Sequence, residues 1–340
     1  MDMVMHEENR EPKLPSAVGT RKAVPAAFID FIRGGGKFLV AGHKEPDGDC
    51  VGSQLALCSF LGRLGKEAVP CSPGPFKRTE IQPYKERFTS QPSGAERAGA
   101  RVILADCSAK DRTGDLEPYL EGLPLGIIDH HVSASFDGEA VYLDPGAPSV
   151  TSMVLELIEA FDMKPLREEA QLLLFGLCTD TGFFRHVDAG GAATFAQASR
   201  MIAAGASPKA AFQAINGGKN LNSRILMGIV LSRAQPCFDG RLILSFEEYE
   251  DTQRYGLDSR DSDMLYQLLQ SVTGVEAVAV IRQETPENCT VGLRSRDRVN
   301  VSEIAARLGG GGHKNAAGLS IPGHIAEIRS RLLEEFKKQF

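Results

Sequence analysis

The segment Leu123-Pro-Leu-Gly-Ile-Ile-Asp-His-His131 is a short apolar run that ends in three polar residues. Two other apolar runs end in a similar way, because Lys37–Ala41 leads to His43 and Arg101–Ala105 leads directly to Asp106. In open α/β sheets, active sites assemble beyond the carboxyl ends of the strands. The three runs therefore predict parallel strands that deliver acidic and imidazole side chains to one edge of a sheet.

Three more aspartates follow apolar runs. Residues 172–178 precede Asp180, and Asp47 and Asp49 follow the strand-like run that leads to His43. Because Asp47 and Asp49 are two residues apart, we expect both carboxylates to face one side of an extended loop, where each can serve a different ion. Aspartate oxygens with a minority of imidazole nitrogens suit Mn²⁺ or Mg²⁺ and also allow Zn²⁺. Two such ions, about 4 Å apart, activate a water and hold a phosphoryl group. Asp106 suits a ligand shared by both.

A phosphate substrate also needs positive neighbours, because four aspartates and a bridging hydroxide leave two divalent ions slightly negative. Residues 309–312 are four consecutive glycines, and such a run is entropically costly unless the backbone has to approach a ligand closely. We therefore expect this run to contact the substrate rather than to form only a turn. The cationic candidates are His131, Arg185, His186, Arg294 and His313.

With these motifs the chain resembles the DHH phosphoesterase family, which is named after a motif like that at residues 129–131. The resemblance extends from about Phe38 to Gly318 and includes the glycine-rich signature of the family's associated C-terminal domain, here at residues 309–318. The pattern similar to the first family motif is His43-x3-Asp47-x-Asp49-x2-Gly52-Ser53.

The resemblance implies roles for individual residues. It places one divalent ion on His43, Asp47 and Asp106, and a second on Asp49, Asp106, His130 and Asp180. Asp106, Asp129 and His131 are then the catalytic residues, with Asp129 orienting its neighbours. The expected metal is Mn²⁺, with Mg²⁺ or Co²⁺ as alternatives. The implied substrate contacts are Arg185, Arg294, Gly310, Gly311, Gly312 and His313.

The predicted fold is α/β. We expect a mainly parallel sheet in a DHH catalytic domain over residues 23–216 and a smaller α/β substrate-binding domain over residues 235–340, with a cleft between them. Residues 217–234 are expected to form a linker and a linking helix. Residues 1–22 are polar and expected to be disordered. Residues 70–92 contain five prolines and are predicted to form a loop.

Composition places the protein among ordinary globular chains. Of its 340 residues, 42% are hydrophobic and 24% are charged, and no apolar run approaches the ~18 residues of a membrane span. The N-terminus lacks the features of a signal peptide, and the seven cysteines form no recognisable disulfide or zinc pattern. We therefore expect a cytoplasmic protein without a membrane partner. Cys50, Cys107 and Cys178 lie beside predicted metal ligands and are expected to be packing residues or targets of soft metal ions.

A net charge of −6 disfavours binding along a nucleic acid, which requires extended basic surface. The leading hypothesis is therefore hydrolysis of short RNA, from dinucleotides to a few nucleotides, as in the nanoRNase branch of the family, together with dephosphorylation of adenosine 3′,5′-bisphosphate. We expect no long DNA as a partner, and a homodimer is compatible with the sequence. The alternatives are a phosphodiesterase for cyclic or linear dinucleotides and a non-catalytic nucleotide-binding regulator. A RecJ-type exonuclease and a manganese pyrophosphatase fit less well.

Overall fold

The structure is a computed structural model that describes residues 22–131, 138–296 and 298–340. The chain divides into two compact units, which meet in the sequence between Gly218 and Lys219. The expected disorder of residues 1–22 concerns a segment that, apart from Lys22, lies outside the described residues.

The first unit is built on a sheet of five parallel strands in the order β2-β1-β3-β4-β5. In this order the connection after β1 runs to β2 on one side, whereas the connection after β3 runs to β4 on the other side. A crevice therefore opens beyond the carboxyl ends of β1 and β3. The predicted strands are present, whereas sequence reasoning did not single out the edge strands β2 and β5. The strands are β1 (Lys37–Ala41), β2 (Glu67–Cys71), β3 (Arg101–Ala105), β4 (Leu125–Asp129) and β5 (Ala140–Leu143).

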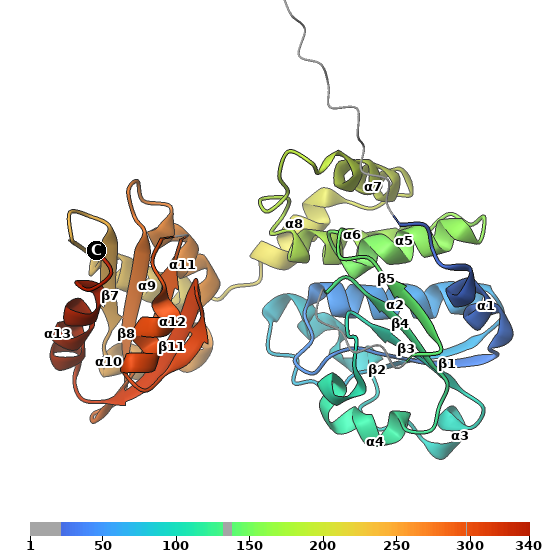
Figure 1. The fold of residues 1–340 in the computed structure, drawn as a ribbon, viewed down its shortest axis with the longest axis horizontal. Coiled ribbons are helices and arrows are strands. Elements are labelled where there is room, and N and C mark those ends of the chain that lie inside the picture. Colours follow the sequence, from blue (N-terminus) through green and yellow to red (C-terminus); the bar gives the residue numbers. More distant parts are fainter. Residues whose placement is uncertain (1–21, 132–137, 297) are drawn as a thin grey trace, which may run out of the picture. The chain divides into compact units, whose positions relative to one another are not determined.

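Helices cover both faces of this sheet (Figure 1). The central strands are buried on both sides, which explains their continuous apolar runs. On one face, α1 (Ala26–Gly34), α2 (Gly48–Arg63), α5 (Val150–Ala160) and α6 (Arg167–Asp180) pack on residues such as Val40, Ile103 and Ile128. On the other face, η2 (Lys110–Leu116) and α4 (Glu117–Leu120) pack on Leu39, Val102 and Ile127. The remaining helices are α3 (Gly94–Arg97), α7 (Ala192–Ala203) and α8 (Pro208–Asn216).

Two local expectations for this unit were wrong. Helix α2 begins at Gly48, because the Asp47 carboxylate accepts hydrogen bonds from the backbone N–H groups of Asp49 and Cys50 and caps the helix. Asp47 and Asp49 therefore do not share an extended loop. The predicted proline-rich loop contains the 3₁₀ helix η1 (Thr79–Arg87), and Asp180 is the last residue of helix α6.

The second unit is a mixed sheet in the order β10-β11-β9-β8-β7-β6, in which only β7 and β8 run parallel. On one face, α12 (Val301–Arg307) and α13 (Ile325–Phe336) bury an apolar core. On the other, α9 (Leu221–Ser232) and α11 (Ser262–Gln270) pack over β7 and β8. The strands are β6 (Gln235–Cys237), β7 (Leu242–Glu247), β8 (Ala277–Thr285), β9 (Asn288–Ser295), β10 (Gly311–His313) and β11 (Ala316–Pro322).

The helix expected to link the domains is α9, and its apolar side belongs to the core of the second unit. Two shorter elements, α10 (Tyr249–Tyr255) and η3 (Leu257–Ser259), precede α11, which starts at Ser262 where Asp261 caps it. Among the described residues, no helix combines the length and apolarity that crossing a membrane requires.

Candidate metal centre

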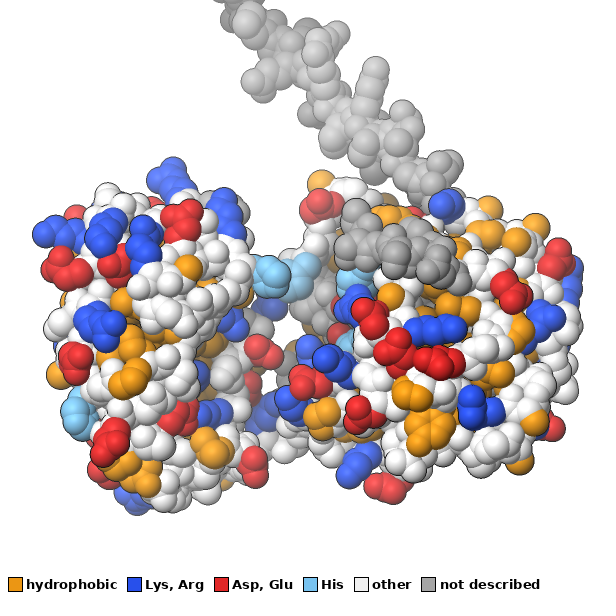
Figure 2. Space-filling view, turned by 60° about the horizontal axis from the view of Figure 1, so that its bottom comes forward, with side chains coloured by type: hydrophobic (Ala, Val, Ile, Leu, Met, Phe, Trp, Pro, Cys, Tyr) orange, Lys and Arg blue, Asp and Glu red, His pale blue; other side chains and the backbone are white. Residues whose placement is uncertain are grey.

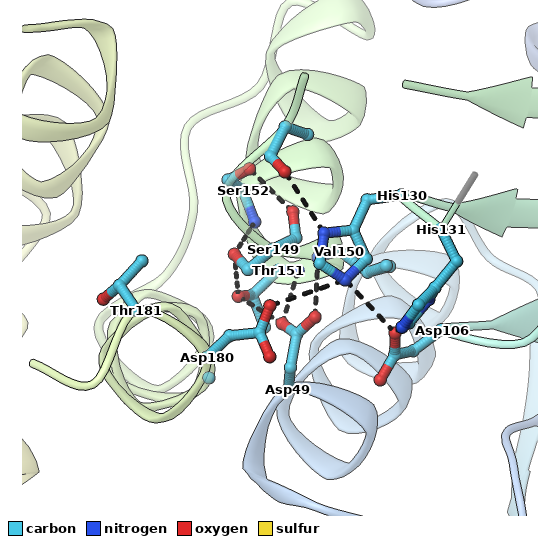
Figure 3. A network of polar contacts seen from close by, with 12 residues as sticks. Asp49, Asp106, His130, His131, Ser149, Val150, Thr151, Ser152, Asp180 and Thr181 are labelled. Atoms are coloured by element: carbon cyan, nitrogen blue, oxygen red, sulfur yellow. Dashed lines mark hydrogen bonds and ion pairs between the residues drawn. The ribbon is translucent and has the colours of Figure 1, made fainter. Parts of the chain in front are cut away.

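Five elements of the first unit converge on one group of acidic and imidazole side chains. Figure 3 shows Asp49, Asp106, His130, His131 and Asp180 of this group. The ends of β1, β3 and β4 deliver His43, Asp106 and the pair His130–His131. The last residue of α6 adds Asp180, and the first turn of α2 adds Asp49. The crevice expected from the strand order is therefore the place where these predicted residues meet.

Asp106 lies at the centre of the group. Its carboxylate is 3.5 Å from His43 Nε2, 3.7 Å from His130 Nε2 and 3.6 Å from His131 Nδ1. The side chain is almost completely buried, and Oδ1 has no hydrogen-bond partner among the described residues. The backbone is left-handed, with φ of 59°, a conformation that aspartate tolerates better than most residues. An unsatisfied buried oxygen is costly, so this arrangement requires a ligand or a proton.

A second set of ligand atoms comes from Asp49, His130 and Asp180, which lie within 4.8 Å of one another. His130 Nε2 is 3.4 Å from Asp180 Oδ2. Asp49 is held at the start of α5, where its oxygens accept hydrogen bonds from Val150 N at 2.7 Å, Thr151 N at 2.9 Å and Thr151 Oγ1 at 2.7 Å. Sequence reasoning missed this support, although a helix N-terminus is a general site for anionic groups.

The backbone sets the orientation of two imidazoles. Nδ1 of His43 lies 2.8 Å from the Lys44 carbonyl oxygen, and Nδ1 of His130 lies 3.1 Å from the Ala147 carbonyl oxygen. A carbonyl only accepts, so both Nδ1 atoms carry the proton. In the neutral ring, Nε2 then presents its lone pair toward Asp106, as a metal-binding histidine does.

His131 has a different partner. Its Nδ1 donates to Asp129 Oδ1 at 2.8 Å, and the same oxygen accepts from the His131 backbone N–H at 3.1 Å. Asp129 is completely buried at the end of β4. The hydrogen bond to Asp129 raises the pKa of His131, whereas Arg112, which sequence reasoning did not single out, acts in the opposite direction. The hydrogen bond to Asp129 therefore fixes the orientation of the His131 ring.

The carboxylates of the group are short of positive charge. Burial and the neighbouring Asp49 raise the pKa of Asp106, and burial together with Asp47 raises that of Asp49. Burial and Asp49 raise the pKa of Asp180 to about 7. Burial lowers the pKa of His130, but Asp49 and Asp106 outweigh it, so the net shift is upward. The shifts of the three carboxylates show negative charge that a nearby cation would stabilise.

The donor set fits divalent metal ions. Carboxylate oxygens predominate, two imidazoles present Nε2, and the central oxygen of Asp106 has no partner among the described residues. Hard or borderline ions such as Mn²⁺, Mg²⁺ and Zn²⁺ prefer these ligands. His43 and Asp106 would hold one ion, and Asp49, His130 and Asp180 with Asp106 would hold another.

Two predicted residues of this unit are placed differently. Asp47 does not belong to any of the groups of close ligand atoms among the described residues, and its Oδ1 caps α2. It is nevertheless near enough to raise the pKa values of Asp49 and Asp106, in each case after the larger effect of burial. Arg185 is exposed, and its Nη2 lies 3.3 Å from Nε2 of His186 rather than against the carboxylates.

Cys50 lies beside the first ligand set. Its sulfur is within 4.8 Å of ligand atoms of His43 and Asp106, and its Sγ is 3.5 Å from Gln54 Oε1. It lies in the first turn of α2 and is completely buried. Burial raises the pKa of the Cys50 thiol, which protects it from oxidation. Cys107 and Cys178 are also buried.

The other predicted substrate contacts lie in the second unit. Arg294 in β9 pairs with Ala316 in β11, which in turn pairs with His313 in β10. Directly paired residues point to the same face, so Arg294 and His313 flank Ala316 on one side of the sheet. A neighbouring row on the same face lies two residues further along each strand. It consists of Gly292, Gly318 and Gly311, which have no side chains.

The glycines of the predicted run differ in how much space a side chain would have at each position. A Cβ on Gly310 would lie 2.4 Å from the Gly318 carbonyl oxygen, and one on Gly312 would lie 2.5 Å from the Ala316 carbonyl oxygen. Both positions are therefore required by the β10–β11 hairpin itself. A Cβ on Gly311 would meet nothing within 4 Å, and one on Gly318 would make only an ordinary contact. Gly311 and Gly318 are thus the positions open to a ligand.

Comparison with known proteins agrees with this organisation. The chain matches the DHH family, N-terminal domain, over residues 37–177 and the DHHA1 domain over residues 242–340. It is 31% identical over 317 residues to the bifunctional oligoribonuclease and PAP phosphatase NrnA of Thermus thermophilus, covering 89% of this chain and 90% of that protein. It is 26% identical to the cyclic-di-AMP phosphodiesterase GdpP of Geobacillus thermodenitrificans, covering 94% of this chain and 50% of that longer protein.

A solved structure of similar fold is an exopolyphosphatase-related protein from Bacteroides fragilis, with a TM-score of 0.78 and 22% identity, covering 93% of this chain and 97% of that one. This likeness shows a shared fold across both units.

Proposed function

The chain belongs to the DHH family, and from this premise we propose that it is a metal-dependent hydrolase of short oligoribonucleotides that also dephosphorylates adenosine 3′,5′-bisphosphate. Its similarity to the Thermus thermophilus oligoribonuclease and PAP phosphatase extends over 89% of its length and includes both units. The observation that carries the proposal is the buried Asp106 carboxylate, which faces three imidazoles and has an oxygen without a partner among the described residues.

In this proposal the first ion is held by His43 and Asp106 together with the Asp47 oxygen that does not cap α2, and the second by Asp49, Asp106, His130 and Asp180. We propose Mn²⁺ as the metal because carboxylates outnumber imidazoles in both sets. When bound, the ions would supply an activated water and stabilise the charge that develops on the phosphoryl oxygens.

The protein's own residues orient the substrate and supply the proton. Asp129 holds the His131 ring by Nδ1, so that Nε2 can give its proton to the departing oxygen. The hydrogen bond to Asp129 raises the pKa of His131, which favours the protonated ring that a general acid requires. Asp129 is therefore a positioning residue and His131 the general acid.

The second unit would anchor the substrate through Arg294, His313 and the open backbone at Gly311. Arg185 in the first unit is a further cation for the phosphates. On the face shown in Figure 2, basic and acidic side chains are interspersed on both units rather than gathered into one basic area. With a net charge of −6, the protein gains little from contact with a longer strand. These features support short substrates.

A turnover panel with Mn²⁺ tests the proposal. It compares a dinucleotide, an RNA roughly ten times longer, adenosine 3′,5′-bisphosphate, a cyclic dinucleotide and pyrophosphate, with the Asp106→Asn protein prepared in parallel as a control for contaminating nucleases. We expect the dinucleotide to be cleaved fastest and the bisphosphate to lose one phosphate. Faster cleavage of the long RNA, or turnover of pyrophosphate alone, would contradict the proposal.

A second candidate is a phosphodiesterase for cyclic dinucleotides. The similarity to the cyclic-di-AMP phosphodiesterase GdpP, which covers 94% of this chain, favours it. Both functions use the same metal centre, so the panel separates them by the relative kcat/KM for cyclic and linear dinucleotides.

A further inference from the structure

Three arginines of the second unit differ in their partners. Arg260 forms ion pairs with Glu247 at 2.7 Å and with Glu284 at 2.9 Å, and Arg282 lies 3.3 Å from Glu247. Arg294 is half-buried on β9, yet no carboxylate among the described residues lies within ion-pairing distance of its guanidinium. A guanidinium kept partly out of water without a carboxylate is available for an anionic ligand.

An aromatic ring holds this guanidinium in place. The Cζ atom of Arg294 lies 4.6 Å from the centre of the Tyr266 ring, and Nη1 donates to the Leu293 carbonyl oxygen at 3.0 Å. Tyr266 is only 4% exposed and belongs to the apolar core that α9 and α11 form over β7 and β8. Because packing fixes the ring, the ring in turn limits the positions that the long arginine side chain can adopt.

Strand β9 leaves space for the Tyr266 ring. A Cβ built on Gly292 would lie 1.9 Å from the Tyr266 hydroxyl, so any larger residue there would displace the ring. Gly292 lies two residues before Arg294 on the same face of β9, in the row with Gly318 and Gly311. The missing side chain at Gly292 therefore makes room for Tyr266, whereas those at Gly318 and Gly311 leave the sheet surface open.

We propose that Tyr266 is a positioning residue that holds the Arg294 guanidinium beside the open backbone of Gly311 and Gly318, where it binds a phosphate group of the nucleotide substrate. Gly292 is the position that permits this placement. The inference rests on the proposed function, because it names how that substrate is anchored. It adds a residue to which neither the sequence motifs nor the metal centre draws attention.

Steady-state kinetics with a dinucleotide and Mn²⁺ test the inference. Arg294→Ala should raise KM about tenfold with kcat nearly unchanged, as expected for loss of a charge-assisted contact made equally in the ground and transition states. Tyr266→Leu and Gly292→Ala should each raise KM about threefold to tenfold, the loss expected when a cation–π contact no longer restrains the guanidinium. Tyr266→Phe, which keeps the ring, should leave KM unchanged.

A double-mutant cycle separates positioning from general destabilisation. If Tyr266 acts through Arg294, Tyr266→Leu combined with Arg294→Ala should have no higher KM than Arg294→Ala alone. Leu269→Ala is the matched control, because Leu269 belongs to the same apolar core and has no aromatic ring with which to hold the guanidinium. This variant should lower the midpoint of urea unfolding and leave KM unchanged.

Additive effects of the two substitutions on KM, or an equal rise in KM in the Leu269→Ala control, would overturn the inference. Turnover by the wild type tests the proposed function separately. If the wild type cleaves dinucleotides and the whole series shows an unchanged KM, the inference fails while the proposed function stands.

Discussion

The end of the parallel sheet in the first unit and the open sheet face of the second unit lack opposite kinds of charge. In the first unit, Asp49, Asp106 and Asp180 are brought together with little positive charge, and their pKa values rise through burial and mutual repulsion. In the second, Arg294 has no carboxylate partner among the described residues and stands beside exposed backbone. The first site therefore suits cations, and the second is the one that we propose for an anion.

The two sites also differ in how they are made. Side chains of the metal centre are placed by the ends of strands and helices, which meet because the sheet order creates a crevice between β1 and β3. The proposed substrate surface is placed by strand register, which sets Arg294 opposite Ala316 and Ala316 opposite His313. A metal phosphoesterase needs both kinds of site, since the metals act on the phosphorus and a separate surface holds the rest of the substrate.

The largest effect is expected when the central carboxylate of the first site is neutralised. Asp106→Asn should lower kcat by more than about 100-fold, because even outer partners of metal ligands cost about 10–100-fold. In EDTA the same variant should be more stable to urea than the wild type, since a buried charge has been removed. Near-normal turnover at saturating Mn²⁺ would exclude Asp106 from the metal centre.

The second prediction concerns the pH dependence of the metal-free protein. The folded protein keeps Asp180 protonated up to about pH 7, whereas an unfolded aspartate ionises near about pH 4. Between these values the folded state binds more protons, so the free energy of unfolding in EDTA should fall as the pH rises, by on the order of 2 kcal/mol. His130, whose pKa is also raised, changes stability in the same direction.

Urea unfolding at several pH values between 4 and 8 measures this dependence. Asp180→Asn should flatten it, and Mn²⁺ should reverse it, because a bound cation favours the ionised carboxylates. A metal-free wild type whose stability rises over this pH range would contradict the description of the site as crowded with negative charge.

The third prediction tests the second site without disturbing its fold. Gly318→Val adds a side chain to the open surface, where a Cβ makes only an ordinary contact, and should raise KM for a dinucleotide about tenfold with little change in Tm. Gly310→Ala should instead lower Tm with little change in KM, because its Cβ would lie 2.4 Å from the Gly318 carbonyl oxygen. If Gly318→Val binds substrate normally, the substrate does not use this surface.

The smallest effect is expected at Cys50. With Mn²⁺, Cys50→Ser should retain activity within roughly twofold, because a hard ion has little use for sulfur. With Cd²⁺, the wild type should be inhibited more strongly than the variant and should show sulfur-to-cadmium charge-transfer absorption, since Cys50 lies with His43 and Asp106. Peroxide should leave both proteins active, because the thiol is buried. Equal inhibition by Cd²⁺ would make Cys50 a packing residue only.

Much of the first site was predictable from the sequence because strand ends are local signals. The apolar runs of β1, β3 and β4 lead to polar residues, and in a parallel sheet their carboxyl ends must meet at one edge. The family resemblance then gave these residues expected roles, and the matches to the DHH and DHHA1 domains confirm the family.

Residues that act through distant contacts could not be found in this way. Asp49 is held by the start of α5, a helix about a hundred residues further along the chain, and Asp47 caps α2 rather than sharing a loop with Asp49. Tyr266 and Gly292 belong to a helix and a strand with no motif of their own, and only packing brings the ring onto Arg294.

The local pattern of apolar and polar residues therefore determined the parallel sheet and the kinds of side chain at its edge, because strand periodicity and strand ends are encoded within a few neighbouring residues. The tertiary structure decided which oxygen lacks a partner, which imidazole nitrogen carries the proton, and which glycines are open to a ligand. These properties depend on hydrogen bonds and contacts between segments far apart in the chain, and such contacts exist only once the chain has folded.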